Sequence, residues 1–492
     1  MAPVAPTSAT AGATSGDGVV PTDIGDRYLA HRPPLGDVTV VDVAGESSDR
    51  KLLATTLQGI VNRTEARIYL RGMRATAEDQ YWIDWYQSQG LITVTATVGL
   101  DAALTTFASE AAGYVVADDA EPWTLNTATT VAGALGGVVV TPATLAAAQG
   151  AGLAELDDHR GRWPDAATAY EATAAAWADR LDLASAALQQ PGLHNPRDLY
   201  VQQGVLVVYT RPSQSDFDRV YDVLETLPTD HPLYGYVSDT GDEEVAAVAR
   251  IALGGRYLVP TDTTDNLSFH LAVGDAARAV PTYPSVDDVE PCSADDVNVV
   301  LAVTDGDNQV IPEAYFPRSV AWNSARRGEL PFAWGLNPAT SILMPSVWDH
   351  YTATAGPNDE IVDLMGLGYT FPSVMPGGTE FLADANRLRD ALGIPTHWSL
   401  DALIRTPDAG GWTVWDDAIA ASGAPGPEGF LLNYVDFGGP AWFHTPSGRV
   451  ALASQEAQYA AGPAEVLTEI EALQAADPAE RPLVNLFAVT VW

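Results

Sequence analysis

Apolar and polar residues follow two alternating patterns along most of the chain. Short apolar runs at residues 37–43, 66–70 and 205–209 have the length of buried strands, whereas residues 48–63 place apolar side chains at helical spacing. Strands and helices that alternate in this way are typical of α/β proteins with largely parallel sheets. The sequence therefore predicts an α/β fold.

The pattern divides into two series of elements, with a predicted boundary after residue 190. Residues 28–190 are expected to form an N-terminal, Rossmann-like α/β domain that ends in an alanine-rich helix over residues 167–188. Residues 191–492 contain about eight strand-like runs, which suits a (β/α) barrel, although a doubly wound open sheet has the same local pattern. These runs are residues 205–209, 233–237, 257–259, 297–304, 331–336, 396–400, 429–435 and 484–489.

The first 27 residues are rich in Ala, Pro, Thr, Ser and Gly and predict a disordered tail. They lack the basic start and apolar core of an intact signal peptide. Their composition resembles the start of an exported protein whose signal has been removed, so we expect a secreted or extracytoplasmic protein, with a cytoplasmic origin as the alternative. No stretch has the length and apolar character of a membrane span.

Composition narrows the classes of function. Hydrophobic residues make up 47% of the chain, which is enough for a large core, and 64 acidic residues against 25 basic ones give a formal charge of −39. This charge argues against a nucleic-acid partner, because phosphate binding needs clustered Lys and Arg. The single cysteine, Cys292, excludes an internal disulfide framework and a cysteine-based zinc site.

Candidate chemistry gathers at the predicted carboxyl ends of the barrel strands, where barrel enzymes build their active sites. Acidic, amide and aromatic residues recur there, and this mixture is typical of carbohydrate sites, because carboxylates transfer protons, amides bind hydroxyls and aromatic faces stack on sugar rings. The candidate catalytic residues are Asp305, Asp307, Asp359 and Asp436. The candidate substrate-binding residues are Asn308, Gln309, Trp334, Asn337, Tyr369, His397 and Asn433.

The run Asp305-Gly306-Asp307-Asn308 is the most informative of these segments, because it follows a continuous apolar strand. Its two carboxylates could form an acid–base element or contribute oxygen ligands to a calcium or magnesium ion. An ordinary Asp-Gly turn is the structural alternative. His397, next to Trp398, is either a site histidine or a core histidine with its hydrogen bonds satisfied.

The segment Gly366-Leu-Gly-Tyr-Thr-Phe-Pro372 resembles the signature of the GxGYxYP family of glycoside hydrolases. It departs at Phe371, which keeps the ring of the motif's second tyrosine but not its hydroxyl. Residues 52–63 and the Asp305–Asn308 turn are also similar to that family. The resemblance implies an N-terminal α/β domain, a C-terminal barrel-like domain and action on sugars, and it assigns no catalytic pair.

We therefore expect a glycoside hydrolase with a carboxylate pair at the rim of a barrel and a carbohydrate as its partner. No cofactor is expected, although a calcium ion beside Asp305 and Asp307 is compatible with the pattern. The alternatives are a non-catalytic carbohydrate-binding protein and a metal-dependent hydrolase that uses the Asp305/Asp307 turn. In the barrel, the turns at residues 305–308, 334–337 and 433–436 should converge, and the loop at residues 358–372 should bring Tyr369 near Asp307.

Overall fold

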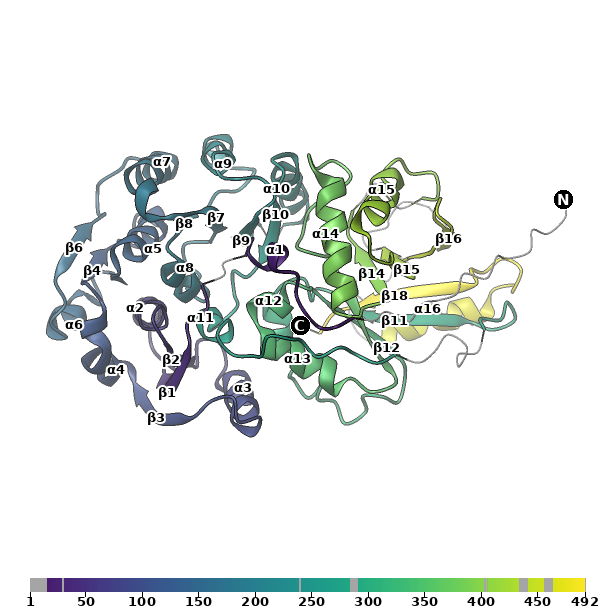
Figure 1. Ribbon diagram of the computed structural model, residues 1–492, viewed down its shortest axis with the longest axis horizontal. Coiled ribbons are helices and arrows are strands. Elements are labelled where there is room, and N and C mark those ends of the chain that lie inside the picture. The colour runs from purple at the N-terminus through teal and green to yellow at the C-terminus, as the bar shows by residue number, and fades with distance from the viewer. Residues whose placement is uncertain are drawn as a thin grey trace.

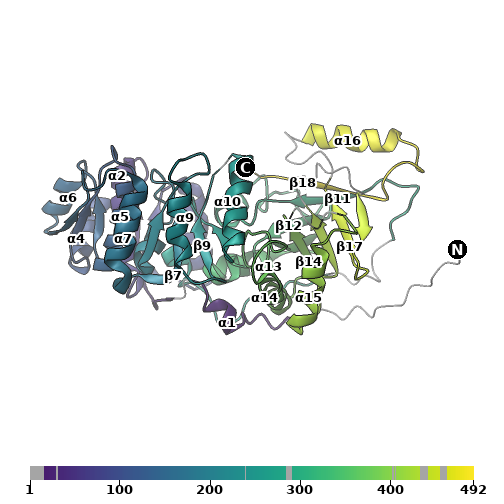
Figure 2. The ribbon, with the colours of Figure 1, turned by 90° about the horizontal axis from the view of Figure 1, so that it is seen from above.

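The computed structural model describes residues 16–28, 31–238, 240–283, 291–401, 404, 406–432, 441–454 and 463–491. Two three-stranded sheets lie at one end of the long axis, a four-stranded sheet lies in the middle and an eight-stranded sheet lies at the other end, and helices flank them (Figures 1 and 2). All strand pairs are parallel except the one between β16 and β17. The predicted α/β class is confirmed. No helix in the described part of the chain is long and apolar enough to cross a bilayer.

Two three-stranded sheets form the N-terminal third, with strand orders β2-β1-β3 and β5-β4-β6. Helix α2 lies between them and is buried over its last ten residues, and its N-cap Ser47 accepts a hydrogen bond from the amide of Arg50. The first sheet contains β1 (Leu35–Asp42), β2 (Ala66–Arg71) and β3 (Val94–Gly99), with α2 (Ser48–Val61), α3 (Thr76–Ser88) and α4 (Leu100–Phe107). The second contains β4 (Tyr114–Val116), β5 (Val138–Val140) and β6 (Glu155–Asp158), with α5 (Trp123–Leu135), α6 (Leu145–Gly150) and α7 (Ala166–Trp177).

A four-stranded sheet of order β10-β9-β7-β8 occupies the middle of the molecule. Its strands are β7 (Asp182–Leu188), β8 (Val205–Val208), β9 (Pro232–Gly235) and β10 (Tyr257–Pro260). Its helices are α8 (Arg197–Gln203), α9 (Phe217–Glu225), α10 (Gly241–Leu253) and α11 (Leu267–His270). The predicted domain boundary after residue 190 falls inside this sheet, between β7 and β8.

The middle sheet differs from the predictions in two ways. The expected helix over residues 167–188 is wrong beyond Trp177, because β7 takes its last seven residues. Alanine favours helices, but the last four residues of β7 are fully buried in the centre of a sheet, and this packing overrides local propensity. The runs at residues 205–209, 233–237 and 257–259 belong to this sheet rather than to the barrel.

The C-terminal part is an eight-stranded sheet that nearly closes into a barrel. Its order is β16-β17-β15-β14-β13-β12-β11-β18, and a parallel bridge between Ser454 and Leu486 connects the β17 side back to β18. The strands are β11 (Asn298–Val303), β12 (Phe332–Leu336), β13 (Asp359–Leu364), β14 (Thr396–Ser399), β15 (Gly429–Leu432), β16 (Trp442–His444), β17 (Val450–Ala453) and β18 (Val484–Val489). The helices are α12 (Thr340–Leu343), α13 (Pro345–Thr354), α14 (Gly378–Ala391), α15 (Trp412–Ser422) and α16 (Pro463–Ala475).

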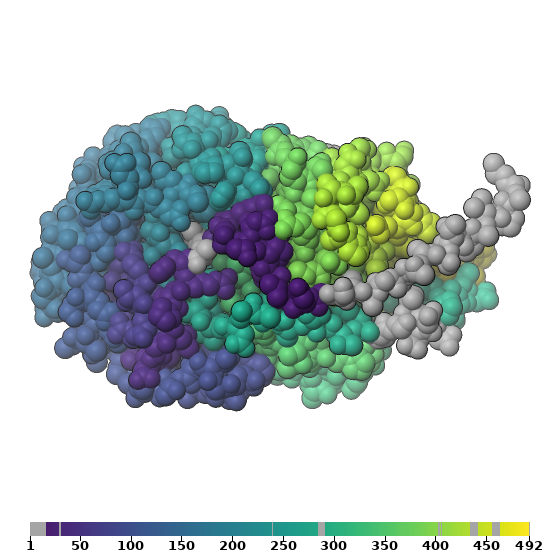
Figure 3. Space-filling model, viewed as in Figure 1, coloured from purple at the N-terminus to yellow at the C-terminus, as the bar shows by residue number. Residues whose placement is uncertain are grey.

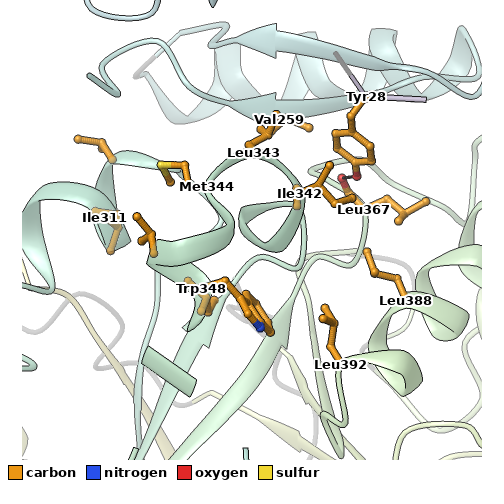
Figure 4. Packing of buried hydrophobic residues seen from close by; sticks show 14 of the residues in the cluster. Tyr28, Val259, Ile311, Ile342, Leu343, Met344, Trp348, Leu367, Leu388 and Leu392 are labelled. Carbon is orange, nitrogen blue, oxygen red and sulfur yellow. Dashed lines mark hydrogen bonds between the residues drawn. The ribbon is translucent and has the colours of Figure 1, made fainter. Parts of the chain in front are cut away.

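One hydrophobic core joins the first sheet, the middle sheet and the barrel. It includes Val259 of β10, Leu343 of α12 and Trp348 of α13, all fully buried or nearly so. Figure 4 shows these side chains packed between the middle sheet and the helices of the barrel. Because apolar burial is the main stabilising contribution in folding, this shared core holds the sheets together as one body.

The segment at residues 16–28 crosses the junction between these parts (Figure 3, purple). It includes α1 (Thr22–Gly25), and its Asp23 pairs with Arg387 of α14 at 2.8 Å. The hydroxyl of the buried Tyr28 donates a 2.5 Å hydrogen bond to the carbonyl of Leu367, which Figure 4 also shows. The prediction of a disordered tail is therefore wrong for residues 16–27, because polar contacts and the burial of Ile24 and of the adjoining Tyr28 fix them to the fold.

Candidate active site at the rim of the barrel

The turn that follows β11 is held tightly against the end of β12. Asp305 adopts a left-handed conformation with φ 66°, and a Cβ on Gly306 would lie 1.8 Å from the carbonyl oxygen of Gly335, so only glycine fits there. The amide of Asn337 donates a 3.0 Å hydrogen bond to the carbonyl of Gly306. The turn therefore presents Asp305 and Asp307 at the carboxyl end of the parallel strands.

Burial gives Asp307 unusual acid–base properties. Its side chain is buried, with 9% of the residue's surface exposed. Burial first, and then the charges of Asp305 and Glu244, raise the pKa of Asp307 to about 7. Asp307 can therefore carry a proton at neutral pH, which an ordinary aspartic acid cannot.

Glu244 brings a third carboxylate to this rim from a different sheet. It lies in the first turn of α10, a helix of the middle sheet, and is half-buried. Burial and the nearby charge of Asp305 raise the pKa of Glu244, whereas hydrogen bonds from Tyr236 and Tyr369 lower it. The carboxylates of Asp305, Asp307 and Glu244 thus come from the barrel and from the middle-sheet region, and the charge of Asp305 raises the pKa of the other two.

The loop at residues 365–372 connects the barrel to the middle sheet. Met365 and Gly366 both have positive φ, and a Cβ on Gly368 would lie 2.7 Å from the carbonyl oxygen of Leu258. This close approach lets Tyr369 pair with Leu258 through two backbone hydrogen bonds of 2.6 and 2.8 Å. The hydroxyl of Tyr369 then donates to Glu244 Oε1 at 3.0 Å. Gly366 is thus needed for the turn, and Gly368 is needed for the close approach of the loop to Leu258.

His397 supports this loop from the side of the barrel that is covered by helices. Its Nδ1 lies 2.7 Å from Asp363 Oδ2, and both residues are buried on neighbouring strands. The other oxygen of Asp363 accepts a 2.8 Å hydrogen bond from the amide of Gly366. The ring of His397 packs against Trp415, with 4.6 Å between the ring centroids. His397 therefore lies in the core and contributes to the rim through Asp363.

Asp359 and Trp334 lie together, but away from the Asp305 turn. Asp359 is the first residue of β13, so roughly 16 Å of strand separate it from the rim at Leu364. Its carboxylate accepts hydrogen bonds from the Trp334 indole at 3.0 Å, from Arg327 at 3.2 Å and from the amide of Gly356 at 2.8 Å. These two residues line a separate surface pocket of about 350 Å³. The expectation of one loop over residues 358–372 is wrong, because β13 forms within it.

The predicted amide residues of the rim are used within the protein. Asn337 donates to the carbonyl of Leu364 at 2.8 Å, and the oxygen of the fully buried Gln309 accepts from Thr340 at 2.8 Å. The Asn308 side chain accepts a hydrogen bond of 3.3 Å from the amide of Val310. These residues shape the turn and the adjoining strand ends. Asn433 and Asp436 lie outside the described residues.

Glu244 and Asp363 are the two rim residues that local sequence patterns do not single out. Glu244 follows Asp242 and Glu243, and acidic residues in a first helical turn are common because they favour the helix dipole. Asp363 interrupts an apolar run and made β13 hard to recognise. One feature points to the Asp363–His397 pair. Asp363 is an acid within an apolar run, and His397 lies at the paired position of the next strand.

Comparisons with known proteins agree with this architecture. Three family models match in chain order: the GxGYxYP_N first domain at residues 37–109, the GxGYxYP_N second domain at residues 111–181, and the "GxGYxYP putative glycoside hydrolase C-terminal domain" at residues 295–426. A search of curated proteins found no match. A crystal structure described as "a putative hydrolase from Bacteroides thetaiotaomicron VPI-5482" is 19% identical and has a TM-score of 0.79, with 97% of this chain and 93% of that chain covered. At this identity the likeness concerns the fold.

Proposed function

Because this chain belongs to the GxGYxYP family, we propose that it is a glycoside hydrolase whose acid–base chemistry rests on Asp307 and Asp305. The observation that carries the proposal is the buried carboxyl group of Asp307 in a turn that also holds a second carboxylate, an arrangement that raises the pKa of Asp307 to about 7. Glycosidic bond cleavage needs one protonated and one ionised carboxyl group. Burial and neighbouring charges supply this difference at the rim.

In the proposed reaction, Asp307 is the general acid and donates its proton to the glycosidic oxygen as the bond to the leaving sugar breaks. Asp305 is the ionised partner, acting on the anomeric carbon either directly as a nucleophile or through a water molecule as a base. In the nucleophile route, water hydrolyses the glycosyl ester, supplies the hydroxyl group of the product and returns its other proton to Asp307. In the base route, Asp305 takes a proton from the attacking water, and exchange with solvent returns a proton to Asp307 and removes one from Asp305. The anomeric form of the first product distinguishes the two roles of Asp305.

Glu244 and Tyr369 are positioning residues in this proposal. The charge of Glu244 helps to keep Asp307 protonated, and the Tyr369 hydroxyl holds Glu244 in place at 3.0 Å. Partly exposed aromatic rings adjoin them: Tyr236 bonds to Glu244, and Phe371 lies edge-on to Tyr369 with 6.0 Å between the ring centroids. Rings of this kind can stack on a sugar.

A screen of chromogenic glycosides and polysaccharides, read by released chromophore and reducing ends, tests the proposal. We expect turnover of at least one substrate by the wild type, and its loss in Asp305→Asn and Asp307→Asn. Asp242→Asn, an exposed carboxylate on the first turn of α10, is the matched control and should keep full activity. Sugar binding without any product would favour a carbohydrate-binding protein instead. Full activity in both rim variants would disprove the assignment.

A further inference from the structure

A second acidic cluster lies deep in the molecule, where three sheets meet. Asp79 comes from α3 of the first sheet, Asp265 follows β10 of the middle sheet, and Glu313 belongs to the short π-helical turn Ile311–Tyr315 that follows the Asp305 turn. One carboxylate oxygen of each residue lies within 4.8 Å of the others. All three residues are at most 2% exposed. Three segments that are distant in sequence therefore bring their acids to one buried point.

The charges around this cluster do not balance. Burial is the largest cause that raises the pKa of Asp79, Asp265 and Glu313, and the mutual repulsion of the three adds to it for Asp79 and Glu313. Among the described residues none of the three forms a direct ion pair with an arginine or a lysine, although the charge of Arg74 lowers the pKa of all three and that of Lys51 lowers the pKa of Asp265. The nearby cations are directed to other groups: Arg74 donates to the Tyr315 hydroxyl and to the Thr263 carbonyl, and Lys51 donates to the Met73 carbonyl. Glu78 adds a further negative charge.

An unpaired hydroxyl faces the same point. Tyr69 is fully buried, and its hydroxyl has no hydrogen-bond partner among the described residues. Burial first, and then the negative charges of Asp79, Glu313 and Asp265, raise the pKa of Tyr69, so these acids lie within electrostatic range of its hydroxyl. Glu313 Oε2 is buried and unpaired as well. A buried polar atom without a hydrogen-bond partner destabilises the fold, so these two atoms call for a group that can bind both.

We propose that Asp79, Asp265 and Glu313 bind a single calcium ion, with the Tyr69 hydroxyl contacting the ion or a water molecule bound to it. All available ligand atoms are oxygens, which hard cations prefer. The three ligand atoms lie within 4.8 Å of one another, and calcium–oxygen distances of about 2.3–2.6 Å can span such separations. Calcium suits a buried site whose ligands come from the protein, whereas magnesium usually keeps several of its water molecules.

Such an ion would fasten the first sheet, the middle sheet and the barrel to one another. It would also fix the start of the segment after the rim turn, because Glu313 lies four residues beyond Gln309. The site does not depend on the proposed hydrolase activity, since none of its ligands takes part in the rim chemistry. The ion is sealed from solvent by its ligands' burial and therefore has a structural role.

The test uses the full chain, stripped with a chelator, dialysed and reloaded with CaCl2. We expect about one calcium ion per chain by elemental analysis and a rise of several degrees in melting temperature on reloading. Terbium should substitute for calcium and give luminescence on excitation of tryptophan, because the Trp82 indole donates to the backbone carbonyl of Glu313 at 2.6 Å. These measurements on the wild type remain decisive if a variant fails to fold.

The variants Asp265→Asn and Glu313→Gln should weaken calcium binding by at least about 100-fold. Asp305→Asn is the matched control and should bind one ion as the wild type does. The proposal would be overturned if the stripped wild type binds no calcium and no divalent cation changes its melting temperature. That result would indicate that the three carboxyl groups are neutralised by shared protons instead. The proposal would also be overturned if Asp305→Asn loses the ion and Glu313→Gln retains it, because the ion would then be bound at the rim.

Discussion

The rim of the barrel and the buried junction each gather three carboxylates, yet they differ in access to water. At the rim, Asp305 and Glu244 are half-buried beside the more buried Asp307. At the junction, the acids are almost completely buried. Both clusters combine an acid of the middle-sheet region with one from the segment after β11. Access to solvent, rather than the kind of residue, distinguishes the two.

This difference has a physical basis. A partly exposed cluster can exchange protons with solvent and with a substrate, so its raised pKa becomes a means of acid catalysis. A sealed cluster cannot gain charge freely and must be neutralised by protons or by a cation, because an unpaired buried charge is very unfavourable. The same residue types, Asp and Glu, therefore favour proton transfer at the surface and the binding of a stabilising cation in the interior.

The largest expected effect is the loss of turnover when the rim acid Asp307 is replaced. Asp307→Asn should lower turnover by about 10²–10⁴-fold, the usual contribution of a general acid, and should remove the decline in rate above about pH 7. Glu244→Gln should instead move that decline to lower pH, because the charge of Glu244 helps to raise the pKa of Asp307. Initial rates across pH 4–9 measure both effects. An unshifted profile in Glu244→Gln would contradict the proposed influence of Glu244.

The second prediction concerns the stability of the same variant. The pKa of Asp307 is raised from 3.8 to about 7, so between these values the folded state holds a proton that the unfolded state has lost, and stability falls as pH rises. Asp307→Asn removes this penalty. It should stabilise the protein by up to about 4 kcal/mol above pH 7 and by almost nothing near pH 4. Urea unfolding at the two pH values tests this, and an equal change at both would refute the burial argument.

The third prediction addresses the junction. Calcium at about 100 times its Kd should stabilise the wild type by about 2.7 kcal/mol, and this gain should vanish in Glu313→Gln. The gain should persist in Asp307→Asn, which lacks the rim acid. Urea unfolding with and without calcium measures each value. An equal gain in wild type and Glu313→Gln would show that the ion stabilises the protein somewhere else.

The smallest expected effect is that of Tyr369→Phe. It removes one hydrogen bond to Glu244, worth about 1 kcal/mol, and should lower turnover by about fivefold. Phe371→Tyr, which restores the tyrosine of the family motif next to it, should leave turnover unchanged. A loss of activity as large as that of Asp307→Asn would show that the Tyr369 hydroxyl contacts the reacting atoms.

Sequence patterns were sufficient for the fold class and for the position of the Asp305 turn, because both depend on local features. The buried strand β11 is a continuous apolar run, and the glycine next to Asp305 marks the turn. The strand β7 was missed because its alanines and serine also suit a helix, and only the surrounding sheet decides between the two.

The composition of the candidate site depends on long-range packing, which local patterns do not contain. Glu244 reaches the rim only because the middle sheet packs against the barrel, and its contact with Tyr369 joins residues that are 125 positions apart. A position of Asp359 at the rim requires a loop over residues 358–372, but residues 359–364 form β13. Once that strand is recognised, its direction alone puts Asp359 at the opposite end of the barrel.

The backbone pairing of Tyr369 with Leu258 has a consequence for how a ligand enters. These two hydrogen bonds continue the middle sheet into the loop of the barrel, so the two walls of the rim cannot swing apart without breaking them. Enzymes that close around a substrate use part of the binding free energy for that movement. A rim that is already assembled avoids this loss, but it accepts only molecules whose shape fits in advance. Under the proposed function, selectivity at this rim is steric, and mutations that loosen the pairing of Tyr369 with Leu258 should broaden it.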